Sequence, residues 1–350
     1  MKANRNQKIN RIFHKLYSKY RKNVISLVTA AVLLVTSMPL ADISGVVSKM
    51  VSTVTNAITA MAADTYTDIS NDIKNGVYTI QNADDFKKLL NADPSVYQKI
   101  TILFSNNQSQ FKASDFTGIE KGLGNEEYPF MGTVKANEGS AINLPINFAL
   151  FEYLSDSANL DTIIFARPEE KNSAMLAENV IHGDVASANK WKIKADPVDD
   201  SGATNYKSFT SVIGNMKNRA KVDLAITLSN GVKVEVSGGD NAGLACGTMG
   251  ENTSLAVSLS SNLLDISGKS NAGVFVGKMS TDATLNIDKC NTLTGVNISA
   301  NNAGGLVGSA ENAEINVGEG VTLTMTGSVD RKSTRLNSSH NVISRMPSSA

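Results

Sequence analysis

The stretch NAGGLVG, residues 302–308, is the last of three related segments in this sequence of 350 residues. The other copies are NAGLACG at 241–247 and NAGVFVG at 271–277, so their final glycines, Gly247, Gly277 and Gly308, lie 30 and 31 residues apart. A further glycine, Gly214, precedes Gly247 by 33 residues and fits the same frame. Self-similarity at this period is typical of proteins built from stacked structural units.

Apolar residues alternate with polar ones after each of these glycines. Val222, Leu255 and Leu285 each follow their glycine by eight residues, and Ile315 follows Gly308 by seven. Alternation at period two indicates strands with one buried face, and the Gly, Asn, Ser and Asp between runs are turn residues. The first runs are Val222/Leu224/Ile226, Leu255/Val257/Leu259, Leu285/Ile287 and Ile315/Val317, and the second runs are Val232/Val234/Val236, Leu264/Ile266, Val296/Ile298 and Val321/Leu323/Met325.

A single repeat buries too little apolar surface to offset the backbone entropy that its ordering costs, so neighbouring repeats must share a core. A β-propeller would usually have a longer period and more aromatic residues. The sequence therefore predicts an all-β fold, a right-handed parallel β-helix (solenoid) over 130–329, with Gly214, Gly247, Gly277 and Gly308 stacked at one corner. We expect Leu255, Val257, Leu285, Ile287, Ile315 and Val317 to point inward, and Ser258, Asn286 and Asn316 outward.

Residues 64–129 are predicted to form an N-terminal cap and the first strands. In YTIQNADDFKKLLN, residues 78–91, Phe86, Leu89 and Leu90 have helical spacing, and Asn82 or Asp84 is suited to the N-cap. A short helix here would cover the open edge of the first rung, which is otherwise prone to aggregate; the alternative is an ordinary surface helix. The polar stretch 166–210 around Trp191 is predicted to form a long loop or imperfect rungs.

The repeats also resemble a known family. NAGGLVGSAENAEINV, residues 302–317, resembles the GLUG-type motif of bacterial surface β-helix proteins, and residues 128–163, YPFMGTVKANEGSAINLPINFALFEYLSDSANLDTI, resemble the first rungs of such proteins. The chain departs from the pattern at Ala245 and Cys246 in the second copy, and at Glu152, which takes the glycine position of an earlier rung. The resemblance covers roughly 64–329 and implies a surface-located solenoid.

The N-terminal region, 1–63, is predicted to be a signal peptide and export region. Residues 1–23 contain eight Lys and Arg and no acid, an apolar run follows over 24–35, and small residues surround Met61. Cleavage near Ala62 or after Ala41 fits this pattern, and an uncleaved membrane anchor is the alternative. We expect a secreted or cell-surface protein, from a Gram-positive bacterium.

The C-terminal segment, 330–350, resembles the translation of a sequencing-library adapter and is predicted to be a non-native tail. The alternative is a basic, Ser-rich disordered tail. No polar capping unit stands between the last repeat and Asp330. We therefore expect the natural chain to continue past Ser328 or Val329 with further rungs, because a solenoid needs its terminal rung covered.

The net charge and the two cysteines limit which partners and which cysteine chemistry can be expected. Residues 64–329 carry 20 Lys and Arg and 31 Asp and Glu, a net charge of −11, which does not suit a phosphate backbone. Nucleic acid is therefore not an expected partner. Cys246 and Cys290 lie at apolar strand positions, so we expect buried free thiols, although an oxidising compartment permits a disulfide.

Candidate catalytic and metal-binding residues are few. His182 is the one histidine of residues 64–329, which excludes a site built on two histidines within this region. The GxG in GLGNEE, 122–127, lacks the rest of a dinucleotide fingerprint and is interpreted as a turn. Adjacent carboxylates are interpreted as solvated turns, because neighbours on a strand point to opposite faces; they are Asp84/Asp85, Glu126/Glu127, Glu169/Glu170 and Asp199/Asp200. We therefore assign no catalytic, cofactor-binding or metal-binding residues and expect no cofactor, with weak calcium binding left open.

The leading functional hypothesis is a non-enzymatic, monomeric surface module with an adhesion, ligand-binding or stalk role. Its expected partners are host or cell-surface glycans or proteins, with no membrane insertion beyond the signal. One alternative is the non-catalytic N-terminal part of a larger secreted enzyme, such as a peptidase or a glycan-active enzyme. Another is a β-helix polysaccharide lyase or hydrolase, for which Arg167, Arg219 and carboxylates that converge from separate rungs would supply the chemistry.

Overall fold

The computed structural model describes residues 66–331 except for 106–110, 138–140, 166–172, 184–188, 196–204, 229–232, 238, 261–262, 291–292, 320 and 322–324. The chain divides into two compact units, Met1–Tyr66 and Thr67–Ala350, and the fold below is that of the second unit. The predicted signal region and residues 332–350 of the predicted tail lie outside the described residues.

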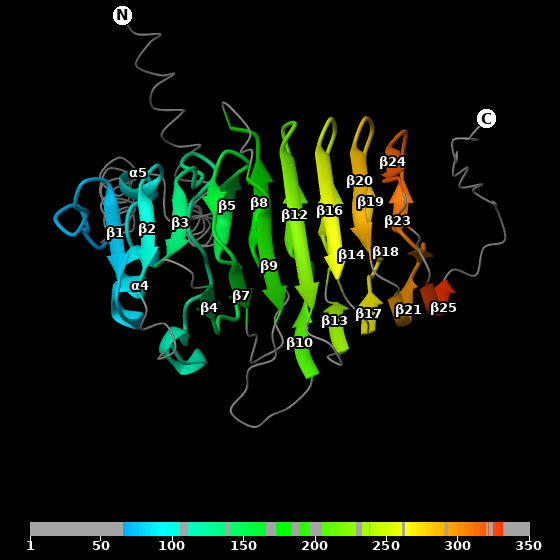
Figure 1. Cartoon of the computed structure of the whole chain (residues 1–350), viewed down its shortest axis with the longest axis horizontal. Helices are drawn as coiled ribbons and strands as arrows, with labels where there is room; N and C mark the ends of the chain where they lie inside the picture. The colour runs from blue at the N-terminus through cyan, green and yellow to red at the C-terminus, as the bar shows by residue number, and fades with distance from the viewer. Residues whose placement is uncertain are drawn as a thin grey trace, which may run out of the picture. The chain divides into compact units, whose positions relative to one another are not determined.

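The second unit is a parallel β-solenoid, as the sequence predicts. Its strands form five sheets, and the chain passes from sheet to sheet before returning one rung further along (Figure 1). The ladders within all five sheets are parallel. Because each rung supplies hydrogen-bond partners and apolar side chains to the next, no repeat has to form a core alone.

The strands are assigned to the sheets as follows. The four-stranded sheet contains β1 (Val77–Ile80), β2 (Thr101–Phe104), β3 (Thr133–Ala136) and β6 (Asn159–Leu160). The seven-stranded sheet contains β4 (Ile142–Leu144), β7 (Ile163–Phe165), β9 (Trp191–Ala195), β12 (Lys221–Leu228), β16 (Ser254–Ser260), β20 (Thr284–Cys290) and β24 (Glu314–Val317). The six-stranded sheet contains β5 (Phe151–Ser155), β8 (Ala177–Ile181), β11 (Ile213–Met216), β15 (Cys246–Met249), β19 (Val276–Met279) and β23 (Val307–Ala310). The five-stranded sheet contains β10 (Asn205–Phe209), β13 (Lys233–Ser237), β17 (Leu263–Ser267), β21 (Leu293–Ala300) and β25 (Met325–Arg331), and the three-stranded sheet contains β14 (Asn241–Gly243), β18 (Asn271–Gly273) and β22 (Asn302–Ala303).

The repeated glycines form the predicted column, but inside strands rather than at a corner. They occupy one register position of the six-stranded sheet, on β11, β15, β19 and β23. The three-stranded sheet of NAG segments packs directly against this column. A Cβ atom on Gly277 would lie 2.6 Å from the backbone nitrogen of Ala242, so only glycine permits this approach. The motif N-A-G-x-x-x-G therefore encodes two strands whose backbones touch.

Glutamates occupy the same column in the two earlier rungs. Glu152 on β5 aligns with Glu178 on β8, which aligns with Gly214 on β11. The three-stranded sheet begins only at β14, so in the described residues no NAG strand packs against these two positions. The predicted equivalence of Glu152 with the glycines is confirmed, and Glu178 is a second replacement that the sequence did not reveal.

The inward positions of the seven-stranded sheet form columns of apolar side chains. Leu285 pairs with Leu255 on one side and Ile315 on the other, and Ile287 pairs with Val257. The inward side chains Leu255, Val257, Leu285 and Ile287 on β16 and β20 are fully buried, as predicted. On the last rung the prediction is only partly right: Ile315 is half-buried, and Val317 is 44% exposed because no further described strand covers β24. The predicted outward residues Ser258, Asn286 and Asn316 are all at least partly exposed.

The predicted second run of the final repeat is wrong in position. The sequence indicated Val321/Leu323/Met325, of which Leu323 lies outside the described residues, whereas β25 begins at Met325 and sets Val329 opposite Ile298. Val329 lies 31 residues after Ile298, which is the length of one rung, and the run at 321 comes too early to complete that rung. Asp330 and Arg331 are the last residues of β25.

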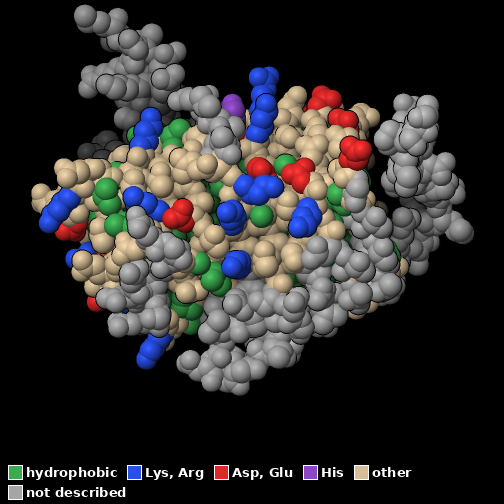
Figure 2. Space-filling view, viewed as in Figure 1, with side chains coloured by type: hydrophobic (Ala, Val, Ile, Leu, Met, Phe, Trp, Pro, Cys, Tyr) green, Lys and Arg blue, Asp and Glu red, His purple; other side chains and the backbone are tan. Residues whose placement is uncertain are grey.

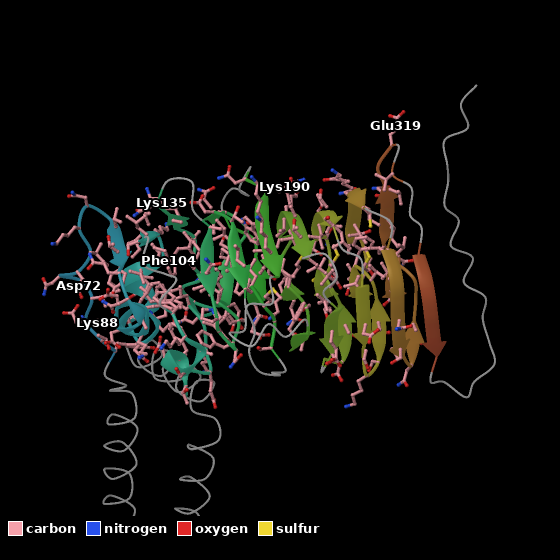
Figure 3. All side chains as sticks on the ribbon, turned by 60° about the horizontal axis from the view of Figure 1, so that its bottom comes forward. Asp72, Lys88, Phe104, Lys135, Lys190 and Glu319 are labelled. Carbon is pink, nitrogen blue, oxygen red and sulfur yellow. The ribbon has the colours of Figure 1, made fainter. Side chains whose placement is uncertain are left out.

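A short helix, α4 (Ala83–Leu90), packs against the first strands, as predicted. Asn82 is its N-cap and accepts hydrogen bonds from the backbone N–H groups of Asp84 and Asp85 at 2.9 and 3.1 Å. Phe86 and Leu89 are fully buried, and the Phe86 ring lies 5.6 Å from that of Phe104. Figure 3 shows Phe104 inside this end of the solenoid, whereas Asp72 and Lys88 point outward. Two further short helices, α5 (Pro94–Tyr97) and the 3₁₀ helix η3 (Ala113–Phe116), complete the region.

The stretch around Trp191 forms imperfect rungs in its described residues, rather than one long loop. Strands β8, β9 and β10 all join sheets of the solenoid. The Trp191 side chain is 1% exposed, and its Nε1 donates a hydrogen bond to the backbone oxygen of Ala158 at 3.0 Å. The large ring therefore fills the core where the sequence lacks regular alternation.

An asparagine ladder explains the first residue of each NAG segment. Nδ2 of Asn271 donates to Oδ1 of Asn241 at 2.6 Å, and Nδ2 of Asn302 donates to Oδ1 of Asn271 at 2.9 Å. Identical amides stacked in register can each donate to one rung and accept from the other. The ladder therefore ties together three successive rungs along one corner.

Replacing Asn271 with alanine is expected to lower the free energy of unfolding by about 1–3 kcal/mol, because two neighbouring amides lose their partner at a buried position. Asn286→Ala is the matched control, since Asn286 accepts a single exposed hydrogen bond from Asn316. The control should change stability by no more than ~0.5 kcal/mol. Urea titrations followed by circular dichroism measure both, and equal effects of the two variants would contradict a stabilising role for the buried ladder.

Candidate functional site

The outward side of the seven-stranded sheet presents charged and polar side chains in a regular array. Residues that alternate with the core columns point away from the solenoid, so neighbouring rungs place their side chains in register. We call this surface the outer face. Its members on β9, β12, β16 and β20 are Lys192, Lys194, Lys221, Asp223, Ala225, Thr227, Ser254, Ala256, Ser258, Ser260, Thr284, Asn286, Asp288 and Lys289.

Lys190, which precedes β9, reaches across the outer face and meets groups from three other rungs. Its Nζ lies 3.1 Å from Oδ1 of Asp223 on β12 and 3.8 Å from Oδ2 of Asp288 on β20. The same ammonium donates a hydrogen bond to Oγ of Ser258 on β16 at 3.3 Å. These side chains are between one third and one half exposed, so each ion pair stabilises the fold by no more than about 1 kcal/mol. The ion pairs hold the carboxylates of Asp223 and Asp288 beside the Lys190 ammonium on the outer face.

Four further lysines on the outer face have no ion pair with a carboxylate of the described residues. Lys192, Lys194, Lys221 and Lys289 are all exposed. Lys192 shares a register position with Ala225, Ser258 and Lys289, and Lys194 shares one with Thr227 and Ser260. Figure 2 shows Lys and Arg side chains gathered around two acidic groups at the middle of this face, over β9, β12 and β16.

Asp156 and His182 form a second polar cluster, at the turns beside the six-stranded sheet. Oδ2 of Asp156 lies 2.9 Å from Nδ1 of His182 and accepts a hydrogen bond from the backbone N–H of Lys221 at 2.8 Å. Oδ1 accepts from the backbone N–H of Gly183 at 2.7 Å. The Asp156 side chain is fully buried, whereas 38% of the His182 side chain is exposed. The carboxylate therefore connects three rungs.

This cluster lacks the serine that a Ser-His-Asp triad requires. The nearby hydroxyls of Ser155 and Ser157 hydrogen-bond to each other at 2.8 Å, and within the described residues neither bonds to His182. The sequence singled out His182 but not Asp156. No sequence signal could have found Asp156, because its three partners become neighbours only through the register of separate rungs.

The other residues that the sequence singled out have structural roles or lie outside the described residues. Asp84 and Asp85 begin α4, where Asp84 pairs with Lys87 at 3.2 Å. Gly124 has a positive φ of 79°, and its N–H donates to the Tyr97 hydroxyl, as fits a turn. Arg219 lies in a left-handed turn with φ 65°. Arg167, Glu169/Glu170 and Asp199/Asp200 lie outside the described residues.

The two cysteines are thiols rather than a disulfide, as predicted, but they differ in burial. Cys246 is fully buried on β15, whereas Cys290 is only half-buried at the end of β20, where a register shift follows Val257 on the paired strand β16. The prediction of two buried thiols is therefore wrong for Cys290. Burial raises the pKa of the Cys246 thiol to about 12 and that of Cys290 to about 11. Neither thiol is ionised near neutral pH, which makes both weak nucleophiles.

Metal-binding groups are not clustered in the part of the chain that the structure describes: no three His, Cys, Asp or Glu side chains there are arranged to hold an ion. No helix among the described residues has the length and apolar character needed to cross a bilayer. No protein-family model, curated protein or solved structure matches the chain.

Proposed function

We propose that this chain is an exported, non-enzymatic β-solenoid module that binds an extracellular partner through its outer face. The observation that carries the proposal is the set of four exposed lysines on the outward side of one parallel sheet, where Lys192 and Lys289 share a register position. The strands hold the backbone of these lysines at fixed spacings, so only the side chains have to be ordered when a partner binds. A long regular surface of this kind suits an extended partner better than a small molecule, which needs a concave pocket.

Export is the second part of the proposal and comes from the sequence. The basic segment, the apolar run and the small residues of 1–63 fit a secretory signal, and the resemblance to GLUG-type surface proteins agrees with it. An adhesive or ligand-binding module on a bacterial surface accounts for both the predicted export and the exposed lysines of the outer face.

Two measurements test the proposal. The first is fractionation of the producing cells, in which we expect the protein in the cell wall or medium with a shortened N-terminus. The second is adhesion of beads coated with the purified chain to a panel of immobilised extracellular glycans and matrix proteins. Beads coated with an unfolded variant such as Leu285→Asp should lose adhesion. A protein that stays in the cytoplasm, or beads whose adhesion does not depend on folding, would contradict the proposal.

A polysaccharide lyase or hydrolase is the second candidate, and one observation favours it. Lys190, Asp223 and Asp288 bring a base and two carboxylates together from three rungs, which is the convergence such an enzyme would need. Both carboxylates lie against the same ammonium, which holds them in charge pairs. We therefore expect this cluster to organise the outer face rather than to transfer protons.

The purified chain is expected to show no turnover of polyuronates or neutral glucans. The measurement is release of unsaturated products at 235 nm, together with reducing ends, over a pH series. Product formation that disappears in Asp223→Asn and Asp288→Asn, but persists in Asp265→Asn on the five-stranded sheet, would assign the enzymatic function instead.

A further inference from the structure

We infer that the outer face binds an acidic polysaccharide, whose carboxylates contact Lys192, Lys194 and Lys221. The inference rests on the proposed binding function and names the class of partner. Lys192 and Lys194 are alternate residues of β9, so their side chains leave the sheet on the same side, about 7 Å apart. Lys221 begins the adjacent strand β12, about 4.8 Å from β9, and because Ala225 pairs with Lys192, Lys221 lies four residues, roughly 13 Å, before Lys192 along the strand direction. The three ammonium groups therefore form a row that follows the strand direction.

The positive charge of this row is local. Residues 64–329 have a net charge of −11, from 20 bases and 31 acids, so most of the surface repels an anionic polymer. On the outer face, however, Asp223 and Asp288 both lie against Lys190. Their pairing leaves Lys192, Lys194, Lys221 and Lys289 available to an external anion. An anionic partner is thus directed to this one face.

Hydroxyl groups adjoin the lysines. The next strand, β16, presents Ser254, Ser258 and Ser260 outward, and Thr227 and Thr284 flank it on β12 and β20. Hydroxyls can both donate and accept, which matches the hydroxyl groups of a sugar ring. A face with cations on one strand and hydroxyls on its neighbours is complementary to a polymer that carries both carboxylates and hydroxyls. A polyuronate has this chemistry.

Nucleic acid has the required charge but does not fit the face as well. Binding of single strands depends on aromatic side chains on which bases stack. None of the outward residues on the described strands of this sheet is aromatic, and Trp191 points into the core. Arginine, which reads phosphates and bases with two hydrogen bonds, is also missing from the outer face as the structure describes it.

The test is a binding titration of the full-length chain with polygalacturonate, using a neutral glucan and single-stranded DNA of similar length as comparison polymers. We expect binding to polygalacturonate that weakens as salt is raised from 50 to 500 mM, because salt screens exposed charges. The triple variant Lys192→Glu, Lys194→Glu and Lys221→Glu should weaken this binding at least tenfold. The matched control is Lys74→Glu, Lys88→Glu and Lys99→Glu, which makes the same charge change at exposed positions of the N-terminal cap and should alter binding less than twofold.

Three outcomes would overturn the inference. They are equal losses in the two triple variants, equal or tighter binding of DNA, and binding of the neutral glucan that the lysine changes leave intact. The last would leave the proposed binding function standing, as would folding-dependent adhesion to a matrix protein in the bead assay. Circular dichroism of each variant confirms that the compared proteins are folded.

Discussion

Replacing Leu285 with aspartate is expected to abolish the cooperative unfolding transition of the solenoid. The Leu285 side chain is fully buried, between Leu255 and Ile315 in the same column, so the substitution removes apolar contacts with both neighbouring rungs. It also places a carboxylate in a column of buried apolar side chains, and the cost of burying an unpaired charge exceeds the stability of most domains. Because each rung is stable only through its neighbours, damage to this rung spreads along the stack.

Two further variants, at Asn286 and Val317, separate the effect of burial from the effect of charge. Asn286→Asp adds the same charge one residue away, on the outer face, and should leave the urea midpoint nearly unchanged. Val317→Asp lies on the last rung, where the side chain is 44% exposed, and should have an intermediate effect. A Leu285→Asp protein whose melting curve matches the wild type would show that this column does not face the core.

The parts of the fold that follow from spacing could be predicted from the sequence. The interval between a glycine and the first buried residue fixes both the register of the six-stranded sheet and the column of Val222, Leu255 and Leu285. The helix at Ala83–Leu90 follows from local chemistry, since Asn82 caps it and Phe86 and Leu89 share one face. Such features can be predicted because each depends only on the spacing of residues within a single strand or helix.

Features that depend on contact between rungs could not be predicted in this way. Leu160 follows Glu152 by eight residues, like its counterparts, yet it lies in β6 and pairs with Val134 of the four-stranded sheet. The asparagine of the NAG segments looks like any turn residue in sequence, and only the stacking of rungs shows that Asn241, Asn271 and Asn302 form a ladder.

The candidate site illustrates the same limit. Lys192 and Lys194 alternate on one strand, so a shared outward direction can be read from the sequence. Asp288, however, is 98 residues from Lys190, and its approach depends on the shift in register between β16 and β20. Sequence inspection left open whether carboxylates of separate rungs converge, and the structure answers that two of them meet at Lys190.

Replacing Asp156 with alanine is expected to lower the free energy of unfolding by roughly 3–5 kcal/mol. The substitution leaves the backbone N–H groups of Gly183 and Lys221 without their acceptor at a buried site, and it removes the partner of His182. Because those groups belong to later rungs, the loss weakens the junction between the first rungs and the regular repeats. The single tryptophan, Trp191, is bonded to Ala158 two residues from the site, so its fluorescence reports on this junction during a urea titration.

Two control variants identify which of the three hydrogen bonds matters. Asp156→Asn has the same size but only one acceptor oxygen, so its amide nitrogen must face a backbone donor, and most of the loss should remain. His182→Ala removes the partly exposed imidazole and leaves both backbone bonds intact, so a change of less than about 1 kcal/mol is expected. A His182→Ala protein as unstable as Asp156→Ala would mean that the imidazole stabilises this corner. The Asp156 carboxylate would then not act chiefly as the acceptor for two successive rungs.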